Sequence, residues 1–321
     1  MQVYFWGTRG SLPASVTKRA IETKLFKAVK ASRGRALDSD EAITAFIQND
    51  LPFAVGGTFG GNTSCVELGG QESYVLCDAG TGLRDFGQQY LKELKAGRKD
   101  LPKIFNIFIS HPHWDHIQGF PFFVPAYIPG HQVRIFGCHA RLEEAFSGQQ
   151  NSLNFPIPLK AMAADISFHL LEPEKDYDIA GLAVRCIKQN HPGDSYGYSF
   201  AKDGRKVVYS TDAEHKKDAE KEDYPFIAFF KDADLLVFDA QYSLADAVDT
   251  KENWGHSSNL VAVELAARAG VKRLCLYHSE HTFADEALAQ FLEDTRNYLK
   301  LYDESSPLAI ELAYDGLKLE I

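Results

Sequence analysis

Three histidines and one aspartate stand within six residues of one another near the middle of the chain. The segment 109–116 reads ISHPHWDH, so an apolar run ends in a stretch that contains His111, His113, Asp115 and His116. Imidazole nitrogens and carboxylate oxygens are donors that zinc, manganese and iron all accept. Four such donors so close in sequence can serve two ions, so the motif predicts a metal site.

Further ligand-type residues follow three apolar runs later in the chain. His191 follows residues 182–189, Asp212 follows residues 206–210, and His278 follows residues 273–277. Taken singly, each of these residues is as consistent with a structural role as with a ligand role. Because loops at strand ends gather functional groups, we expect the three to complete a site for two metal ions.

The elements that must position these residues are short β-rich runs that alternate with helical patterns. The predicted strands cover residues 3–6, 64–68, 74–78, 104–110, 133–136, 182–189, 206–210, 235–239 and 273–277. The predicted helices cover residues 83–95, 140–147, 258–269 and 284–301. The alternation indicates an α/β protein with layered sheets and outer helices. No linker, repeat or low-complexity tract divides the chain, so we expect a single domain over residues 1–321.

One segment, at about residues 12–55, stands apart from this strand-rich frame. Residues 18–35 carry seven basic side chains against Glu22 alone, and an apolar stripe runs through Ile21, Leu25, Phe26 and Val29. This pattern predicts an amphipathic basic helix.

A second helix is expected to begin at about Asp38, which forms a capping box with Glu41, and to stop before Leu51 and Pro52. Together the two helices form an inserted helical hairpin. Its basic face is either a solvated surface packed on the core, a lid that contributes positive charge to a substrate site, a nucleic-acid patch or an oligomer contact.

Composition excludes several classes of protein. The 321 residues are 45% hydrophobic, and 34 basic against 44 acidic side chains give a net charge of −10, which argues against a surface that attracts polyanions everywhere. The five cysteines are scattered and form no CxxC pair, so neither a disulfide framework nor a cysteine zinc site is expected. No apolar run approaches the ~18 residues of a membrane span and the start lacks a basic leader, so we expect a cytoplasmic protein.

Beyond the metal motif, several segments resemble the metallo-β-lactamase superfamily. They are FWGTRGS at 5–11, GGNTSC at 60–65, DAGTG at 78–82, the HxHxDH motif, WGHSS at 254–258 and the strand before His278. Within the superfamily the chain is similar to the branch that contains phosphoribosyl cyclic phosphodiesterases and ribonucleases Z. The resemblance implies an αββα sandwich with the metals at one edge between its two sheets. The hairpin at about 12–55 is the main region that it does not cover.

The resemblance also implies roles for individual residues. In the family pattern His111, His113 and His191 bind one metal, and Asp115, His116 and His278 bind the second. Asp212 bridges the two ions, which are expected to be zinc, with manganese or iron as alternatives. Asp78 resembles the family's supporting carboxylate near the metals, although a turn or helix-capping role fits its sequence context equally.

Hydrolysis by a metal-bound hydroxide is the reaction that a binuclear site of this kind implies. The phosphodiesterase branch carries a Gly-His-Ser motif, which is matched here by Gly255, His256 and Ser257. His256 can therefore donate a hydrogen bond to a phosphate oxygen or protonate the leaving alkoxide, unless it has only a structural or helix-capping role. We expect Asp115 and His256 to be the catalytic residues.

Substrate size depends on a departure from the ribonuclease Z pattern. Residues 238–242 read FDAQY where a ribonuclease Z carries His-Glu-Ala-Thr, and its Gly/Pro-rich arm for tRNA is absent. A small phosphodiester, such as a cyclic nucleotide or a cyclic phosphoribosyl ester, is therefore expected first. An RNA endonuclease is the second hypothesis, because the basic hairpin could hold an RNA backbone, and a non-phosphate hydrolase is the third. A metal-binding scaffold without catalysis and a homodimer are also left open, while no membrane partner is expected.

Overall fold

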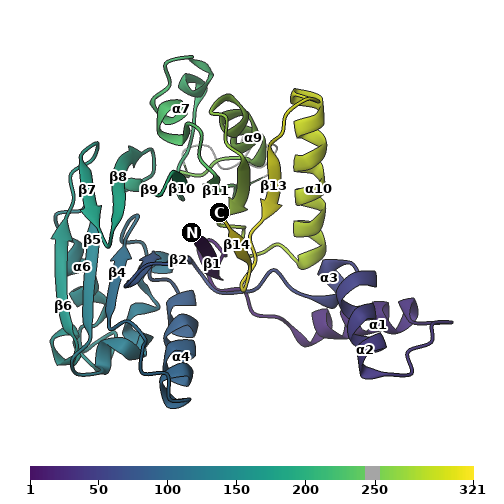
Figure 1. The fold of residues 1–321 in the computed structure, drawn as a ribbon, viewed down its shortest axis with the longest axis horizontal. Helices are drawn as coiled ribbons and strands as arrows, with labels where there is room; N and C mark the ends of the chain where they lie inside the picture. Colours follow the sequence, from purple (N-terminus) through teal and green to yellow (C-terminus); the bar gives the residue numbers. More distant parts are fainter. Residues whose placement is uncertain (243–253) are drawn as a thin grey trace.

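Two seven-stranded sheets packed face to face form the body of the protein in the computed structural model, which describes residues 1–242 and 254–321. Helices cover the outer face of each sheet (Figure 1). The expected αββα sandwich is thus confirmed. Within the described residues, every helix is too short or too polar to cross a lipid bilayer.

The first sheet is antiparallel at one side and parallel at the other. Its order is β14 (Lys318–Glu320), β1 (Gln2–Gly7), β2 (Cys65–Gly69), β3 (Tyr74–Cys77), β4 (Ile104–Phe108), β5 (Gln132–Gly137) and β6 (Asp165–Leu170). Strands β3 to β6 run parallel, so the segments that follow β3 and β4 emerge at the same edge of this sheet.

The second sheet combines four parallel strands with an antiparallel meander. Its order is β13 (Ala309–Leu312), β12 (Arg273–Tyr277), β11 (Leu235–Asp239), β10 (Arg205–Ser210), β9 (Ser195–Lys202), β8 (Leu182–Gln189) and β7 (Asp176–Ile179). Because β10 to β13 are parallel, the residues that follow β10, β11 and β12 lie side by side.

The helices follow the strands as crossover connections or form the segment between β1 and β2. They are α1 (Lys18–Ala31), α2 (Asp40–Ala45), the π-helix η1 (Phe46–Asp50), α3 (Phe53–Gly56), α4 (Gly82–Lys95), α5 (Trp114–Ile117), α6 (Leu142–Gln149), α7 (Pro225–Phe230), α9 (Asn259–Arg268) and α10 (Asp285–Tyr302). Short 3-10 turns are η2 (Phe120–Phe122), η3 (Val124–Tyr127), η4 (Leu159–Ala161) and η5 (Lys217–Glu220).

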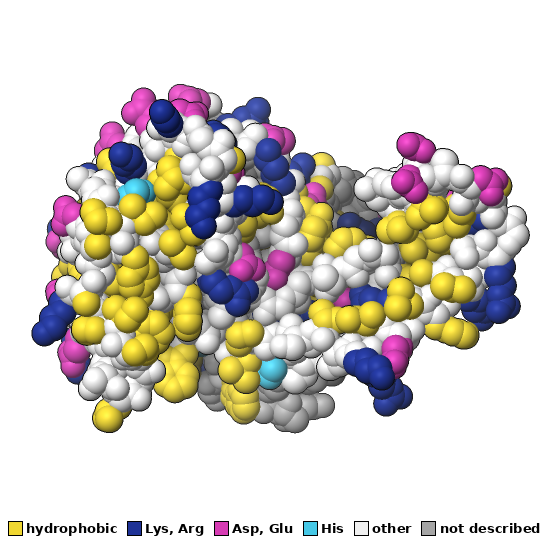
Figure 2. All heavy atoms as spheres, turned by 90° about the horizontal axis from the view of Figure 1, so that it is seen from below, with side chains coloured by type: hydrophobic (Ala, Val, Ile, Leu, Met, Phe, Trp, Pro, Cys, Tyr) yellow, Lys and Arg dark blue, Asp and Glu magenta, His cyan; other side chains and the backbone are white. Residues whose placement is uncertain are grey.

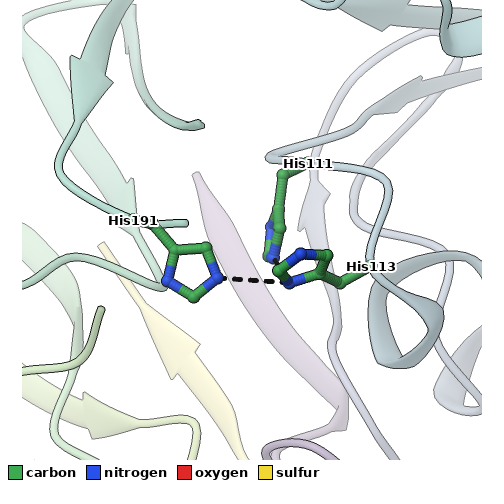
Figure 3. A group of neighbouring side chains, drawn as sticks. All are labelled: His111, His113 and His191. Atoms are coloured by element: carbon green, nitrogen blue, oxygen red, sulfur yellow. Dashed lines mark hydrogen bonds between the residues drawn. The ribbon is translucent and has the colours of Figure 1, made fainter. Parts of the chain in front are cut away.

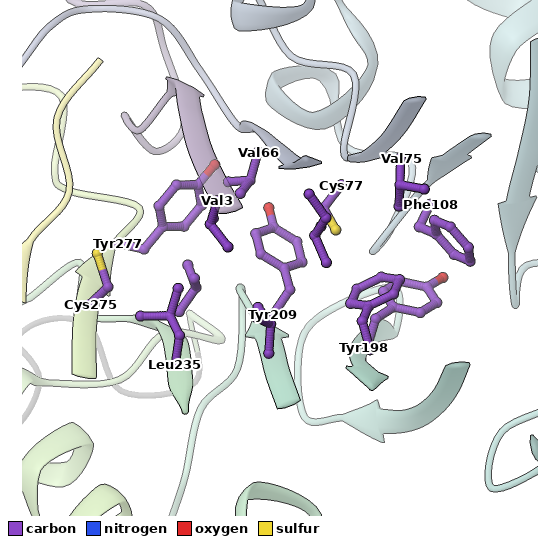
Figure 4. Packing of buried hydrophobic residues seen from close by; sticks show 14 of the residues in the cluster. Val3, Val66, Val75, Cys77, Phe108, Tyr198, Tyr209, Leu235, Cys275 and Tyr277 are labelled. Atoms are coloured by element: carbon purple, nitrogen blue, oxygen red, sulfur yellow. The ribbon is translucent and has the colours of Figure 1, made fainter. Parts of the chain in front are cut away.

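The main core fills the space between the two sheets. Alternate residues of each strand point inward, so that Val3 and Phe108 from the first sheet meet Tyr198 and Leu235 from the second (Figure 4). Buried tyrosines of this core form hydrogen bonds with groups at the edge of the sandwich that carries the loops. The hydroxyl of Tyr198, for example, donates to the carbonyl oxygen of Ile109 at 2.7 Å. The core therefore supports that edge directly.

All nine predicted strands are present, but the sequence analysis missed five others. The missed strands are β6, β7, β9, β13 and β14. Strands β6 and β7 are edge strands with many exposed residues, and β13 and β14 have four and three residues. Strands β6 and β9 do alternate apolar with polar residues, so their signal was present in the sequence and was overlooked.

The segment between β1 and β2 is helical, as predicted, but its boundaries differ. The basic helix α1 ends at Ala31, before a turn in which Gly34 has a φ of +75°. The second helix is capped by Ser39, whose Oγ accepts the N–H of Ala42, so the capping box at Asp38 is wrong. Ser39 rather than Asp38 has the extended backbone of a cap residue, and the helix then continues as η1 to Asp50.

We call residues 12–55 the arm. Its two ends meet, because the N–H of Ala14 donates to the carbonyl oxygen of Gly61 at 2.9 Å. The arm projects from the body beside the start of α10 (Figure 1) and is fixed there by Lys24. The Nζ of Lys24 donates to the carbonyl oxygens of Ala54 and Gly57 and lies 2.6 Å from Oδ2 of Asp285.

Candidate metal centre

The residues predicted to bind metal all follow strands that end at one edge of the sandwich. His111 comes three residues after β4, and His191 comes two residues after β8. His278 directly follows β12, and Asp212 follows β10 after one intervening residue, Thr211. Because these strands end at one edge, the structure brings together all seven side chains that the sequence analysis selected.

One group consists of His111, His113 and His191. The Nε2 of His111 lies 2.8 Å from Nδ1 of His113, and the Nε2 of His191 lies 3.2 Å from the same Nδ1. The three rings point toward one another from the loop after β4 and the loop after β8 (Figure 3). His111 is fully buried, whereas His113 faces solvent.

A second group consists of Asp115, His116 and His278. The Oδ2 of Asp115 lies 3.3 Å from Nε2 of His116 and 3.2 Å from Nε2 of His278. Asp115 and His116 belong to the short helix α5, which directly follows His113. All three side chains are buried.

Asp212 lies between the two groups and faces each with a different oxygen. Its Oδ2 is 3.6 Å from Nε2 of His111, and its Oδ1 is 3.3 Å from Nε2 of both His116 and His278. Asp212 has a φ of +50° and His278 one of +60°, a backbone region that costs of order 1 kcal/mol for residues with a side chain. The surrounding packing holds these strained residues where their side chains converge.

The chemistry of this donor set fits cations. In the first group ring nitrogens converge on one another, and in the second the buried Nε2 of His116 has no hydrogen-bond partner among the described residues. Burial and the imidazole of His116 hold the pKa of His111 well below its usual range, and burial lowers the pKa values of His113 and His191. In the first group these neutral imidazoles are aimed at a shared point next to the carboxylate of Asp212, which is the form that binds divalent ions.

Asp78, which follows β3, holds one side chain of this cluster, His116, in place. Its Oδ2 lies 2.7 Å from Nδ1 of His116, and its Oδ1 accepts the N–H of Ser110 at 2.7 Å. The hydroxyls of Ser110 and Tyr209 also donate to Oδ2. The carboxylate therefore fixes the ring of His116 with Nε2 toward the cluster, which is the arrangement of a ligand-orienting residue.

Backbone groups from distant loops hold other members of the cluster. The N–H of Ser11 donates to Oδ2 of Asp115 at 2.8 Å, and Nδ1 of His191 donates to the carbonyl oxygen of Gly255 at 2.9 Å. Gly255 has a φ of +87°, and a Cβ placed there would lie 2.2 Å from Nδ1 of His191. A side chain at this position would displace His191, so only glycine fits.

His256 adjoins the cluster without belonging to either group. Its ring stacks on His278, with centroids 5.2 Å apart, and its Nδ1 lies 2.9 Å from Oδ2 of Asp239. Burial alone would lower the pKa of His256, but the Asp239 carboxylate outweighs it and raises the pKa to about 9. Since Nδ1 is engaged by Asp239, Nε2 is the nitrogen left to serve a bound molecule.

Ser257 does not cap the helix that follows it. Its Oγ donates to the carbonyl oxygen of Ala213 and accepts the N–H of His215. The cap of α9 is Ser258, whose Oγ accepts the N–H of Val261. Ser257 therefore ties the His256 loop to the segment that follows Asp212.

Sequence reasoning missed Asp239 as a site residue. Asp239 is the last residue of the apolar strand β11, much as Asp212 follows the apolar strand β10. A carboxylate at the end of an apolar strand is a signal that could have identified it. The interactions of Ser110 and Tyr209 with Asp78 had no such signal, because they depend on the packing of the two sheets.

Comparisons with known proteins agree with this fold. The family model for the β-lactamase superfamily domain matches residues 73–279. A ribonuclease Z from Thermoplasma acidophilum is 24% identical over 287 residues, which cover 73% of this chain and 87% of that protein.

Two solved structures are similar over the whole of this chain. The metallo-β-lactamase fold protein YhfI from Bacillus subtilis has a TM-score of 0.62 and 18% identity, with 98% of its chain covered. A diphosphatase from the PhnP family has a TM-score of 0.60 and 20% identity, with 97% of its chain covered. The family match and the fold together show that the chain belongs to the β-lactamase superfamily, among its metallo-β-lactamase-fold hydrolases.

Proposed function

We propose that this protein is a binuclear metal-dependent phosphodiesterase that hydrolyses a small, cyclic phosphodiester. The observation that carries the proposal is the place of His256. It lies against the metal-ligand cluster, stacked on His278 and held by Asp239, yet it is not needed to complete either group of ligands. An imidazole in this position suits a reaction that needs a proton donor beside two cations.

The proposed ligands follow from the two groups described above. His111, His113 and His191 would hold one ion, and Asp115, His116 and His278 would hold the other. Asp212 would contact both, since each of its oxygens faces a different group. Two divalent ions, with zinc expected first and manganese or iron as alternatives, supply an activated water and neutralise charge on a phosphate oxygen.

The residues of this chain would supply the proton for the leaving group. With Asp239 on Nδ1, His256 presents Nε2, which in its protonated form can donate to a phosphate oxygen or protonate the departing alkoxide. Asp115 is fixed by the N–H of Ser11, so its position does not depend on substrate. The exposed His113 and Trp114 mark a side on which the cluster is open to solvent.

The arm favours a small substrate over a polynucleotide. Two of the lysines that suggested a nucleic-acid patch are engaged elsewhere, since Lys24 pairs with Asp285 and Lys27 pairs with Glu286. These two contacts hold both lysines against the start of α10, and the net charge of −10 opposes long-range attraction of RNA. The similar fold of a PhnP-family diphosphatase is consistent with a small phosphate ester.

An RNA endonuclease is the second candidate function. It is favoured by the relatives named ribonuclease Z, of which the protein from Thermoplasma acidophilum aligns over 87% of its length. Phosphodiester hydrolysis is common to both candidates, and only the size of the substrate differs.

Turnover of bis(p-nitrophenyl) phosphate, with and without a chelator, tests the reaction class. Activity that is lost on chelation and restored by zinc or manganese supports a metal-dependent phosphodiesterase, whereas no turnover in the metal-loaded protein contradicts it. Comparing 2′,3′-cyclic nucleotides, 3′,5′-cyclic nucleotides and a precursor tRNA then tests substrate size. Preferred cleavage of the precursor tRNA would replace the small-substrate proposal with the RNA endonuclease.

A further inference from the structure

The arm carries large hydrophobic side chains that its own fold does not use. Helix α1 has no buried residue and rests on the body through a face with the half-buried Ala20, Lys24 and Ala28. The apolar stripe predicted from the sequence lies beside this face and is exposed: Leu25, Phe26 and Val29 are 59, 68 and 66% accessible, and Ile21 is 48% accessible. The core of the protein therefore does not cover this stripe.

The second half of the arm adds to this surface. Ile43 and Ile47, one helical turn apart on α2 and η1, are 40 and 43% exposed. Leu12 and Val16, which lead into α1, are also exposed. Figure 2 shows hydrophobic side chains gathered over the protruding arm at the right of the molecule. An isolated exposed leucine is ordinary, whereas a cluster of this kind on one projecting element marks an interaction surface.

From this surface we propose that the arm is a dimerisation element, in which the arms of two copies of this chain pack against each other about a two-fold axis. In such a contact the exposed stripe of α1 from each copy would lie at the centre of the interface. The exposed apolar side chains of α1 would supply the apolar centre of an interface of standard size, which buries ~800 Å² per partner.

The charges on the arm favour a second copy of this chain as the partner that covers the exposed apolar surface. Arg19, Lys30 and Arg33 form no ion pair with a described residue, and neither do Asp38, Asp40 and Glu41 at the start of the second helix. A surface with a basic part and an acidic part beside one apolar stripe is complementary to itself, as a two-fold contact requires. An anionic lipid surface or an RNA would attract the basic part but repel the acidic part.

The arm is also held ready for such a contact. The Nζ of Lys24 is bonded to three acceptors on α3, the following residue Gly57 and α10, and Arg35 pairs with Asp50 across the hairpin. An element that is already fixed in the free chain loses little conformational entropy on association.

Sedimentation velocity of the full chain over a concentration series tests the proposal. We expect the wild type to be a dimer at micromolar concentration, and the double variant Leu25→Asp/Phe26→Asp to dissociate with a Kd raised by at least about 30-fold, the scale of a lost interface hot spot. Leu301→Asp is the matched control, because Leu301 is 85% exposed on α10, away from the arm, and should leave the dimer intact. Circular dichroism would show that each variant is folded.

A charge-reversal pair tests the two-fold geometry itself. Lys30→Glu/Arg33→Glu makes the free charges of the arm mainly acidic, and Asp40→Lys/Glu41→Lys makes them mainly basic. Each double variant alone should be largely monomeric, whereas an equimolar mixture should form a heterodimer. A wild type that stays monomeric at tens of micromolar, or that binds phosphatidylserine vesicles as a monomer, would overturn the proposal. A dimer whose Kd is unchanged by all of these substitutions in the arm would have its interface elsewhere, and this result would also overturn the proposal.

Discussion

The Nδ1 of His256 lies 2.9 Å from Oδ2 of Asp239, and this contact joins the loop before α9 to the end of β11. Asp239 is fully buried, and its Oδ2 also accepts the backbone N–H of Ala213 at 3.0 Å. The same carboxylate therefore orients the proposed proton donor and fixes the loop that follows the proposed bridging ligand, Asp212.

Replacing His256 should separate catalysis from metal binding. We expect His256→Ala to keep both metals and to lose on the order of 10² to 10⁴ in kcat for a substrate with a poor leaving group, the usual scale for a positioned acid or base. The loss should be much smaller for p-nitrophenyl esters, whose leaving group needs no proton. Equal losses for both kinds of substrate, or loss of metal in elemental analysis, would indicate a structural role instead.

Replacing Asp212 should affect metal content and turnover together. The wild type is expected to bind about two divalent ions, and Asp212→Ala should lose metal and at least about 100-fold in kcat, because its carboxylate faces both groups of ligands. Asp194→Asn is a suitable control, since Asp194 lies near His191 but pairs with Lys188. A wild type that is folded yet binds no metal and gains no activity on metal addition would contradict the binuclear assignment.

Two lysines on α1 provide a matched test of how the arm is fixed. Lys24 is 15% exposed and bonds to three acceptors, so Lys24→Met should lower the free energy of unfolding by about 3 kcal/mol, as expected for breaking a buried ion pair. Lys27 pairs with Glu286 at the surface, and Lys27→Met should cost less than about 1 kcal/mol. Urea unfolding measures both, and similar costs for the two variants would show that Lys24 does not fix the arm.

His215 should make the protein sensitive to acid. Burial among aromatic rings lowers its pKa to about 3, below the value of about 6.5 expected in the unfolded chain. Because the folded pKa is the lower one, the stabilisation is complete above pH about 6.5 and is lost as the pH falls toward 3, with a slope of ~1.4 kcal/mol per pH unit.

The variant His215→Phe should remove that slope while keeping a ring against Phe238. Its thermal midpoint, measured on metal-loaded protein between pH 7 and 5, should therefore fall less than that of the wild type. An identical pH dependence in the two proteins would show that His215 is not responsible.

The sequence predicted the strands around the site better than the rest of the fold. Strand β8, before His191, alternates buried and exposed residues, whereas the strands before His111, Asp212 and His278 are largely buried and read as apolar runs. Strands β6 and β7 are edge strands with exposed residues and carry no such apolar run.

The convergence of the candidate site could be predicted only in part. Side chains at the ends of neighbouring strands were expected to meet, and Asp239 could have been chosen by the same reasoning. The partners of Lys24 could not be predicted, because Asp285 lies 261 residues away in sequence and no local pattern links them. The apolar stripe of α1 could be predicted, but not what covers it, because periodicity shows only that a face is apolar.

The meeting of the two ends of the arm has an evolutionary consequence. Ala14 and Gly61 are joined by a backbone hydrogen bond, so the strands on either side keep their register whatever lies between them. Insertions whose ends are already close together disturb a domain least. Proteins of this fold could thus gain, replace or lose such a segment during evolution. The way in which copies assemble would then change, while the residues at the edge that carries the proposed metal ligands would stay the same.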